Sequence, residues 1–135
     1  MHLVAPLDRT LGWPETEAFA EGFARIVAQQ QRTRFVATMS KRLRTGRIFI
    51  DWLRNKKKAT AILPWSLRAR PGASVAAPVS WKTLGSLDSA AAFNIRSAPE
   101  LANEWGSFAA ASQTISRESR GLIDKAIVQG AKKLF

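Results

Sequence analysis

A single carboxylate within an apolar, alternating stretch is the feature that most constrains how this chain folds. Residues 47–53 read R-I-F-I-D-W-L, a pattern that predicts a strand, because side chains alternate between two faces along a strand. Asp51 then shares one face with Phe49 and Leu53 and is expected to lie among apolar neighbours. The alternative is that Asp51 lies on a solvated face or forms an ion pair with one of the nearby arginines, Arg44, Arg47 or Arg54.

The residues after this strand predict a hairpin followed by a basic turn. Asn55, Lys56 and Lys57 are expected to turn the chain, and A-T-A-I-L-P (residues 59–64) to return as a second strand. Arg68 and Arg70 then follow two residues apart, and such residues share a face in an extended segment. Two guanidinium groups near one carboxylate suit a phosphate held beside a metal ion.

The positive charge of the chain is concentrated in its central part. Residues 32–70 hold twelve Lys or Arg residues and one acid, and the formal net charge of the whole chain is +11. Such segregation predicts a polyanionic partner, most often nucleic acid and less often acidic membrane lipid. The alternative is a basic face that is exposed to solvent and has no partner. The lysines of the turn are either contacts to the DNA backbone or simply exposed to solvent.

Length and composition indicate one globular domain. The chain has 135 residues, of which 46% are hydrophobic and 23% charged. It has no cysteine, which excludes disulfides and thiolate metal sites. Its apolar runs are far shorter than the roughly 18 residues of a membrane span, and no leader-like pattern opens it, so a cytoplasmic protein without a membrane contact is expected.

Helical periodicity recurs at both ends of the chain. Residues 14–30 predict an amphipathic helix whose core face carries Phe19, Phe23, Ile26 and Val27. Short helices are expected near residues 81–87 and 99–105, and short strands at residues 3–7 and 35–38. Residues 113–135 predict a terminal amphipathic helix with a stripe that runs from Ile115 to Leu134. This helix is expected to pack on the domain, to cover other apolar surface, or to pair with a second copy.

Several of these segments resemble one known family. The motifs M-H-L-V-A-P-L-D-R, F-V-A-T-M-S-K, I-F-I-D-W-L-R-N, A-T-A-I-L-P-W-S and L-R-A-R-P-G-A-S-V-A-A-P-V-S-W resemble the polymerase domain of bacterial DNA ligase D, a member of the archaeo-eukaryotic primase superfamily. The similarity runs from about His2 to about Trp105 and covers the C-terminal half of that domain. It implies an α+β fold with a mostly antiparallel sheet and packed helices, resembling the RRM-like half of the primase fold. Residues 1–110 would form this part, and the helix in residues 111–135 would pack on the same domain.

The resemblance also implies roles for individual residues. Asp51 would be the catalytic carboxylate that binds metal, as the third acid of a two-metal site for Mg or Mn. The phosphates of an incoming nucleoside triphosphate would be bound by His2, Arg44, Arg68 and Arg70. The basic turn would contact DNA through Arg54, Lys56, Lys57 and Lys58.

The chain departs from the family at one motif. No Asp-x-Asp pair, the source of the other two metal carboxylates, occurs in the 135 residues. One carboxylate does not hold two ions that each need about six oxygen ligands. We therefore expect a truncated or partial end-joining primase-polymerase domain that is inactive alone. If another chain supplies the missing motif, the expected reaction is templated nucleotide addition to a DNA 3′ end.

Two other interpretations fit the same residues. In the first, the chain is a non-catalytic nucleic-acid-binding module in which Asp51 pairs with an arginine. In the second, the chain is a remnant of the family without activity. Ligase activity is not expected, because the chain has no Lys-x-Asp-Gly motif. The expected partners are DNA, a nucleoside triphosphate, a chain that carries the missing motif, and a second copy of this chain.

Overall fold

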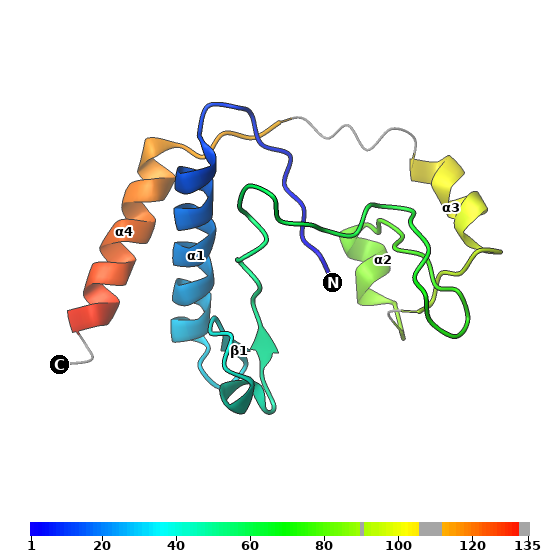
Figure 1. Ribbon diagram of the computed structural model, residues 1–135, viewed down its shortest axis with the longest axis horizontal. Helices are drawn as coiled ribbons and strands as arrows, with labels where there is room; N and C mark the ends of the chain where they lie inside the picture. Colours follow the sequence, from blue (N-terminus) through cyan, green and yellow to red (C-terminus); the bar gives the residue numbers. More distant parts are fainter. Residues whose placement is uncertain (90, 106–111, 133–135) are drawn as a thin grey trace. The chain divides into compact units, whose positions relative to one another are not determined.

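The chain divides into two compact units, which are described separately. The computed structural model describes residues 1–89, 91–105 and 112–132 (Figure 1). Met1–Val4 and Ala61–Ala111 form one unit, which we call the loop unit. Ala5–Thr60 and Ser112–Phe135 form the other, which we call the helical unit.

Helix α1, Trp13–Gln30, is the centre of the helical unit and confirms the first predicted helix. Its first turn contains a proline, which needs no amide hydrogen at that position, and Glu15, which the helix dipole favours there. The predicted core face is only partly correct. The side chain of Phe23 is 51% exposed, whereas Gly22 and Ala24 are the buried residues of the helix. Small residues form this face because another helix approaches closely.

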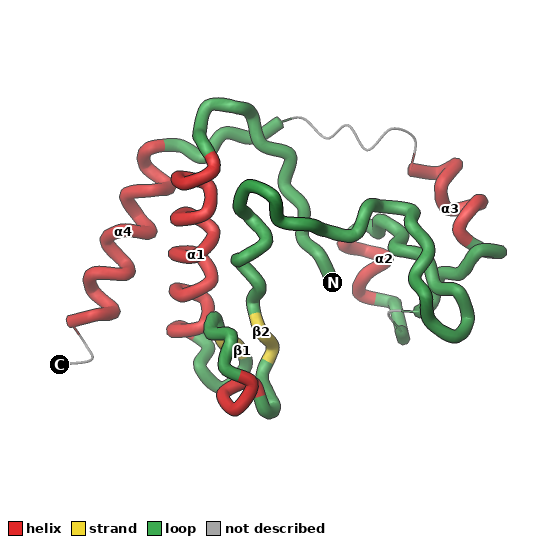
Figure 2. Tube along the Cα trace, viewed as in Figure 1, coloured by secondary structure: helices red, strands yellow, loops and turns green. Residues whose placement is uncertain are grey.

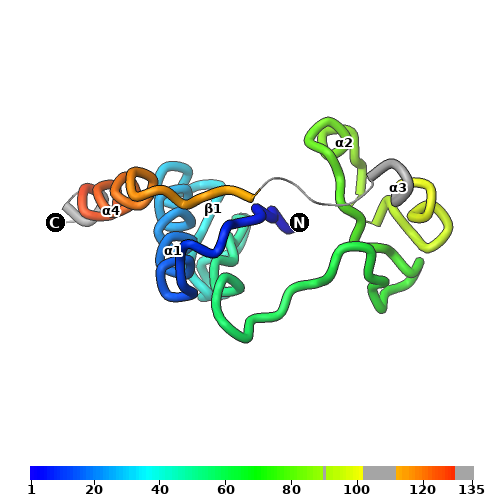
Figure 3. The backbone as a smooth tube through the Cα atoms, turned by 90° about the horizontal axis from the view of Figure 1, so that it is seen from above, coloured from blue at the N-terminus to red at the C-terminus, as the bar shows by residue number. Residues whose placement is uncertain are grey.

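That second helix is α4, Arg117–Lys132, which packs against α1. Figures 1 and 3 show α1 between α4 on one side and the segment of β1 on the other. A β-carbon at Gly22 would overlap Ile123 Cγ2 and lie 3.2 Å from Ile127 Cδ1. A helix is thus present in the predicted terminal segment, and within the helical unit it contacts α1. Leu134 of its predicted stripe lies outside the described residues.

The sheet of the helical unit has two short parallel strands. Strand β1 is Phe35–Val36 and strand β2 is Ile48–Phe49, and they pair in the register Phe35↔Ile48 and Val36↔Phe49. Eleven residues connect them, including the 3-10 helix η1, Lys41–Arg44, and Gly46 at a positive φ of 70°. This connection carries the chain back to the end from which β1 started, so both strands run in the same direction.

The α+β class is thus confirmed, while the predicted antiparallel sheet is wrong (Figure 2). Strand β2 ends at Phe49, and residues 59–64 are not a strand, so the predicted hairpin around the lysines does not form. Among the described residues, antiparallel pairing occurs only as single bridges, Leu67↔Val75 and Ser74↔Asn94, in the loop unit.

Within the helical unit, residues 6–8 form main-chain hydrogen bonds with the segment that precedes α4. The predicted strand at residues 3–7 is reduced to one parallel bridge, Leu7↔Gln113. The amide of Asp8 donates to the carbonyl oxygen of Gln113 (3.0 Å), and the amide of Gln113 donates to that of Pro6 (2.8 Å). The carboxylate of Asp8 accepts hydrogen bonds from the hydroxyls of Thr10 and Thr114. These hydrogen bonds hold the pKa of Asp8 below its ordinary value.

The loop unit is built on turns and two helices. Helix α2 is Trp81–Gly85 and helix α3 is Ala98–Trp105, which confirms both predicted short helices. The hydroxyl of Ser80 accepts from the amide of Thr83 (3.0 Å) and caps α2. Buried residues are few in this unit, and Ser74, Val75 and Ala98 form its centre.

None of the helices in the described ranges has the length and apolar character needed to cross a membrane.

The close contact at Gly22 predicts a size limit at this position. Gly22→Ala is expected to destabilise the protein by about 1–3 kcal/mol, because the added methyl group overpacks the α1–α4 contact. The matched control is Gly121→Ala in α4, where nothing lies within 4 Å of the added carbon. That change is expected to stabilise the helix by about 0.5–1 kcal/mol. Thermal unfolding followed by circular dichroism measures both, and equal effects of the two substitutions would contradict the packing described here.

The hydrogen bonds of Asp8 predict a pH dependence. Because folding lowers the pKa of this carboxyl, its contribution is present above the unfolded pKa of about 4 and is lost as the pH falls through the folded pKa. Asp8→Asn is expected to lower the melting temperature at pH 7 and to flatten its decline between pH 5 and more acidic values. Thr114→Val, which removes one donor, is expected to give part of this change. Parallel melting curves for wild type and Asp8→Asn across that range would contradict it.

Candidate polyanion and nucleotide site

Asp51 lies just beyond the end of β2 rather than within a strand. The last ladder bond is donated by the amide of Ile50 to the carbonyl oxygen of Val36 (2.9 Å), and the chain then leaves the sheet. The prediction that Asp51 lies inside a strand is wrong, and its side chain is 36% exposed. The alternative of an arginine ion pair is confirmed: Arg54 Nε donates to Asp51 Oδ2 at 2.9 Å.

Arg54 closes the segment that carries the lysines, residues 51–60, which we call the lysine loop. Its Nη1 donates to the carbonyl oxygen of Thr60 at 2.7 Å, while its Nε holds Asp51 at the other end. Between them, the side-chain amide of Asn55 donates to the carbonyl oxygen of Trp52 (3.0 Å). The three lysines of the loop, Lys56, Lys57 and Lys58, are exposed.

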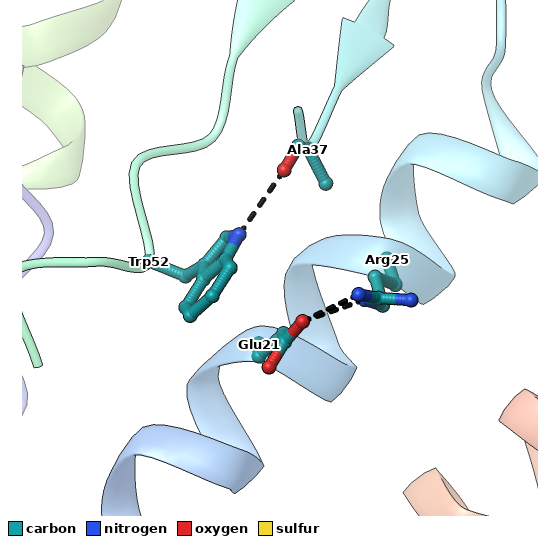
Figure 4. A network of polar contacts seen from close by, with 4 residues as sticks. All are labelled: Glu21, Arg25, Ala37 and Trp52. Atoms are coloured by element: carbon teal, nitrogen blue, oxygen red, sulfur yellow. Dashed lines mark hydrogen bonds and ion pairs between the residues drawn. The ribbon is translucent and has the colours of Figure 1, made fainter. Parts of the chain in front are cut away.

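Trp52 anchors the start of the lysine loop to the sheet. Its indole N–H donates to the carbonyl oxygen of Ala37, the residue after β1, at 3.1 Å (Figure 4). The ring is half-buried beside α1, on which Figure 4 also shows the exposed ion pair between Glu21 and Arg25 (2.6 Å). The loop is therefore attached to the packed part of the helical unit by an aromatic side chain.

Arg44 lies at the end of η1, in the same unit as Asp51. Its guanidinium carbon is 3.8 Å from the centre of the Phe49 ring, a cation–π contact. Its Nε donates to the carbonyl oxygen of Thr38 (3.3 Å). The side chain is thus half-buried on β2 and keeps its positive charge without a carboxylate partner among the described residues.

Arg68 and Arg70 lie at an exposed turn of the loop unit. The amide of Arg68 donates to the carbonyl oxygen of Ser74 (2.8 Å), and the amide of Arg70 donates to that of Arg68 (2.8 Å). The second bond bends the chain between the two arginines, so the prediction of an extended segment at Arg68 and Arg70 is wrong. Gly72, at a φ of 84°, completes the turn. His2 is exposed in the N-terminal piece of the same unit.

The predicted site residues therefore divide between the two units. The helical unit carries Asp51, Arg44 and the basic residues of the lysine loop, and the loop unit carries His2, Arg68 and Arg70. The structure brings Asp51 and Arg54 into direct contact. Sequence reasoning missed the role of Thr60, because a main-chain acceptor leaves no signal in the residue type.

The residues present do not make a metal site by themselves. In the described part of the chain, no three side chains of His, Cys, Asp or Glu come together in a group that could hold an ion. One carboxylate oxygen of Asp51 already accepts from Arg54. A magnesium ion needs near-octahedral oxygen coordination, which this single, occupied carboxylate does not provide. The expectation of Mg or Mn stays a prediction.

The helical unit also contains an open groove that no sequence pattern predicted. Its volume is about 680 Å³, and it lies between α1, the end of β1 and the first residues of the lysine loop. Apolar side chains from these elements line it, including Phe35, Met39 and Trp52, and Arg32 and Arg47 add positive charge. Arg47 Nη1 donates to the main-chain oxygen of Arg32 (3.3 Å), which joins the two arginines at the groove.

Comparison with known proteins identifies the family of this chain. The family model for the LigD primase-polymerase domain matches residues 1–108. The chain belongs to the LigD primase-polymerase domain family. The sequence resemblance to the polymerase domain of ligase D is thereby confirmed.

Three relatives of this LigD-family chain carry the same name. The multifunctional non-homologous end joining protein LigD of Pseudomonas aeruginosa is 38% identical over 126 residues, which cover 89% of this chain and 15% of that protein. The proteins of the same name from Mycobacterium bovis and Mycolicibacterium smegmatis are each 37% identical, over 84 and 81 residues, covering 62% and 60% of this chain. In each of these two, the match covers 11% of the relative. The chain thus spans a small part of the length of the relatives it matches.

Proposed function

We propose that this chain is the part of a LigD-type primase-polymerase that holds DNA and nucleotide phosphates in non-homologous end joining. The observation that carries the proposal is the family match over residues 1–108. The concentration of the entire net charge of +11 in residues 32–70 supports it. This segment includes the lysine loop, and it also includes Arg68 and Arg70 of the exposed turn formed by residues 68–73, which we call the arginine turn.

The lysine loop is the proposed contact to DNA. Its three lysines are exposed and follow one another in a short loop, and the one acid of the central basic segment is neutralised by Arg54. Contacts of lysine with phosphate bind DNA without regard to its sequence and release bound counterions. This suits a protein that must hold DNA ends of any sequence.

The proposed contacts to a nucleoside triphosphate are Arg44, Arg68, Arg70 and His2. Arg68 and Arg70 are exposed at a turn and have no carboxylate partner among the described residues. A guanidinium group presents a planar fork of donors that matches phosphate oxygens. The guanidinium group of Arg44 lies on the ring of Phe49 and forms no ion pair with an acidic residue that the structure describes. Its positive charge therefore favours the binding of an anion beside Phe49.

Asp51 is proposed as one carboxylate of a polymerase metal site that residues outside these 135 complete. The Asp-x-Asp pair is absent from the sequence, so the remaining ligands would come from further residues of the same polypeptide or from a partner chain. Binding to such a site requires that Asp51 give up or share its contact with Arg54. The chain is not proposed to transfer nucleotides by itself.

A non-catalytic DNA-binding module is the second candidate, and one specific observation favours it. The contact between Arg54 and Asp51 at 2.9 Å uses the only predicted metal ligand as an ion-pair partner. In this case the same lysines would hold DNA, and Asp51 would have a structural role only.

The DNA contact of the lysine loop is tested by comparing two variants that each lose three positive charges, one from the loop and one from other exposed positions. Lys56→Gln/Lys57→Gln/Lys58→Gln is expected to reduce the slope of log affinity against log salt concentration by up to about 3, since each lost contact to duplex phosphate contributes about 0.9. Fluorescence anisotropy with a labelled duplex across a salt series measures this slope.

The control is Lys82→Gln/Arg96→Gln/Lys125→Gln, which removes the same charge from exposed positions elsewhere. It is expected to change the slope by less than the loop variant does. Equal slopes for the two variants would contradict a localised contact, and an absence of duplex binding by the wild-type protein at low salt would contradict the proposed function.

A further inference from the structure

Arg54 touches both ends of the lysine loop. Its Nε contacts Asp51 Oδ2 at 2.9 Å, and its Nη1 contacts the carbonyl oxygen of Thr60 at 2.7 Å. Asp51 opens the loop and Thr60 ends it, so one planar side chain spans its base. A guanidinium group suits this arrangement, because its donors point in fixed directions.

The bonds within the loop are local and few. The amide of Asn55 donates to the carbonyl oxygen of Trp52 (3.1 Å), and the amide of Ala59 donates to that of Lys56 (3.1 Å). Lys58 has a φ of 66°, a left-handed conformation that is unfavourable for a residue with a side chain. The side chain of Arg54 adds a contact that joins the two ends of this loop.

The lysines, in contrast, make no ion pair with the residues that the structure describes. The two ion pairs found there are those of Arg25 with Glu21 and of Arg54 with Asp51. Within the loop, therefore, Nε and Nη1 of Arg54 bind groups of the loop itself, while the three lysines make no ion pair with a described residue and are exposed.

We propose that Arg54 is a positioning residue that clamps the lysine loop, and that it favours DNA binding through the loop rather than by contacting phosphate. This inference rests on the proposed DNA contact of the loop. A preformed loop loses less conformational freedom on binding than a mobile one, so clamping raises the affinity of lysines that Arg54 does not touch.

Arg54→Lys is the decisive variant, because it keeps the charge. A lysine in this position would preserve any contact that depends only on the positive charge, but its single ammonium group does not reproduce the fixed two-point contact of the guanidinium. Hydrogen exchange measured by NMR reports on the loop without any DNA. We expect the amides of Asn55 and Ala59 to exchange at least threefold faster in the variant than in the wild type.

Binding of the same variant to a labelled DNA duplex completes the test. We expect affinity to fall about three- to tenfold while the salt slope stays unchanged, because no phosphate contact is lost. Asp51→Ala, which removes the other half of the clamp and one negative charge, is expected to accelerate the same two amides. A pure charge effect of Asp51 would leave their exchange unaltered.

Three results would overturn the proposal or the function on which it rests. Unchanged exchange in Arg54→Lys would exclude the clamp. Faster exchange with unchanged affinity would show that the clamp has no role in DNA binding. An absence of duplex binding by the wild-type protein would refute the proposed function instead. The exchange rates would then still show whether Arg54 holds the ends of the loop together.

Discussion

The close packing of α1 against α4 at Gly22 supports the rest of the helical unit. It places α4 on one side of α1 and leaves the other side for β1, so the short two-stranded sheet has a helix to pack against. Two strands alone are marginal in water and need such a partner. From the end of β1, the carbonyl oxygen of Ala37 holds Trp52, and Trp52 anchors the lysine loop. The proposed DNA contact thus depends on the close packing of a helix pair that carries none of the proposed contact residues.

The electrostatic arrangement explains how so basic a segment contains one acid. Asp51 is not left to attract the lysines, because Arg54 takes its carboxylate at 2.9 Å. An exposed ion pair of this kind adds little stability by itself. Its effect here is geometric, since the same guanidinium also contacts Thr60 and brings the ends of the loop together. In a LigD-type polymerase site completed by further residues, the contact with Arg54 is what a metal ion at Asp51 would have to displace or share.

Helices and the family were predictable from the sequence, whereas strand pairing and the site geometry were not. The spacing of apolar residues and Pro14 located α1 correctly, because helix formation depends on neighbouring residues. The alternation around Asp51 suggested a long strand, but β2 ends at Phe49 since the partner strand β1 ends at Val36. Phe23 was expected in the core, but Gly22 and Ala24 are the buried residues of α1. Which residues are buried depends on how closely α4 approaches, and the sequence of α1 does not show this. The sequence allowed an ion pair of Asp51 with any of three arginines. The turn that follows β2 brings Arg54 to Asp51, and the sequence did not predict this turn.

A backbone-amide NMR titration of the wild-type protein, first with a short DNA duplex and then with a nucleoside triphosphate, tests the central claim most directly. The proposed function predicts that DNA shifts the amide signals of residues 54–59 in the lysine loop. It also predicts that the nucleotide shifts those of residues 68–73 at the arginine turn and of Arg44. Shifts scattered over both units in proportion to exposed charge, or no shifts with either ligand, would contradict the account.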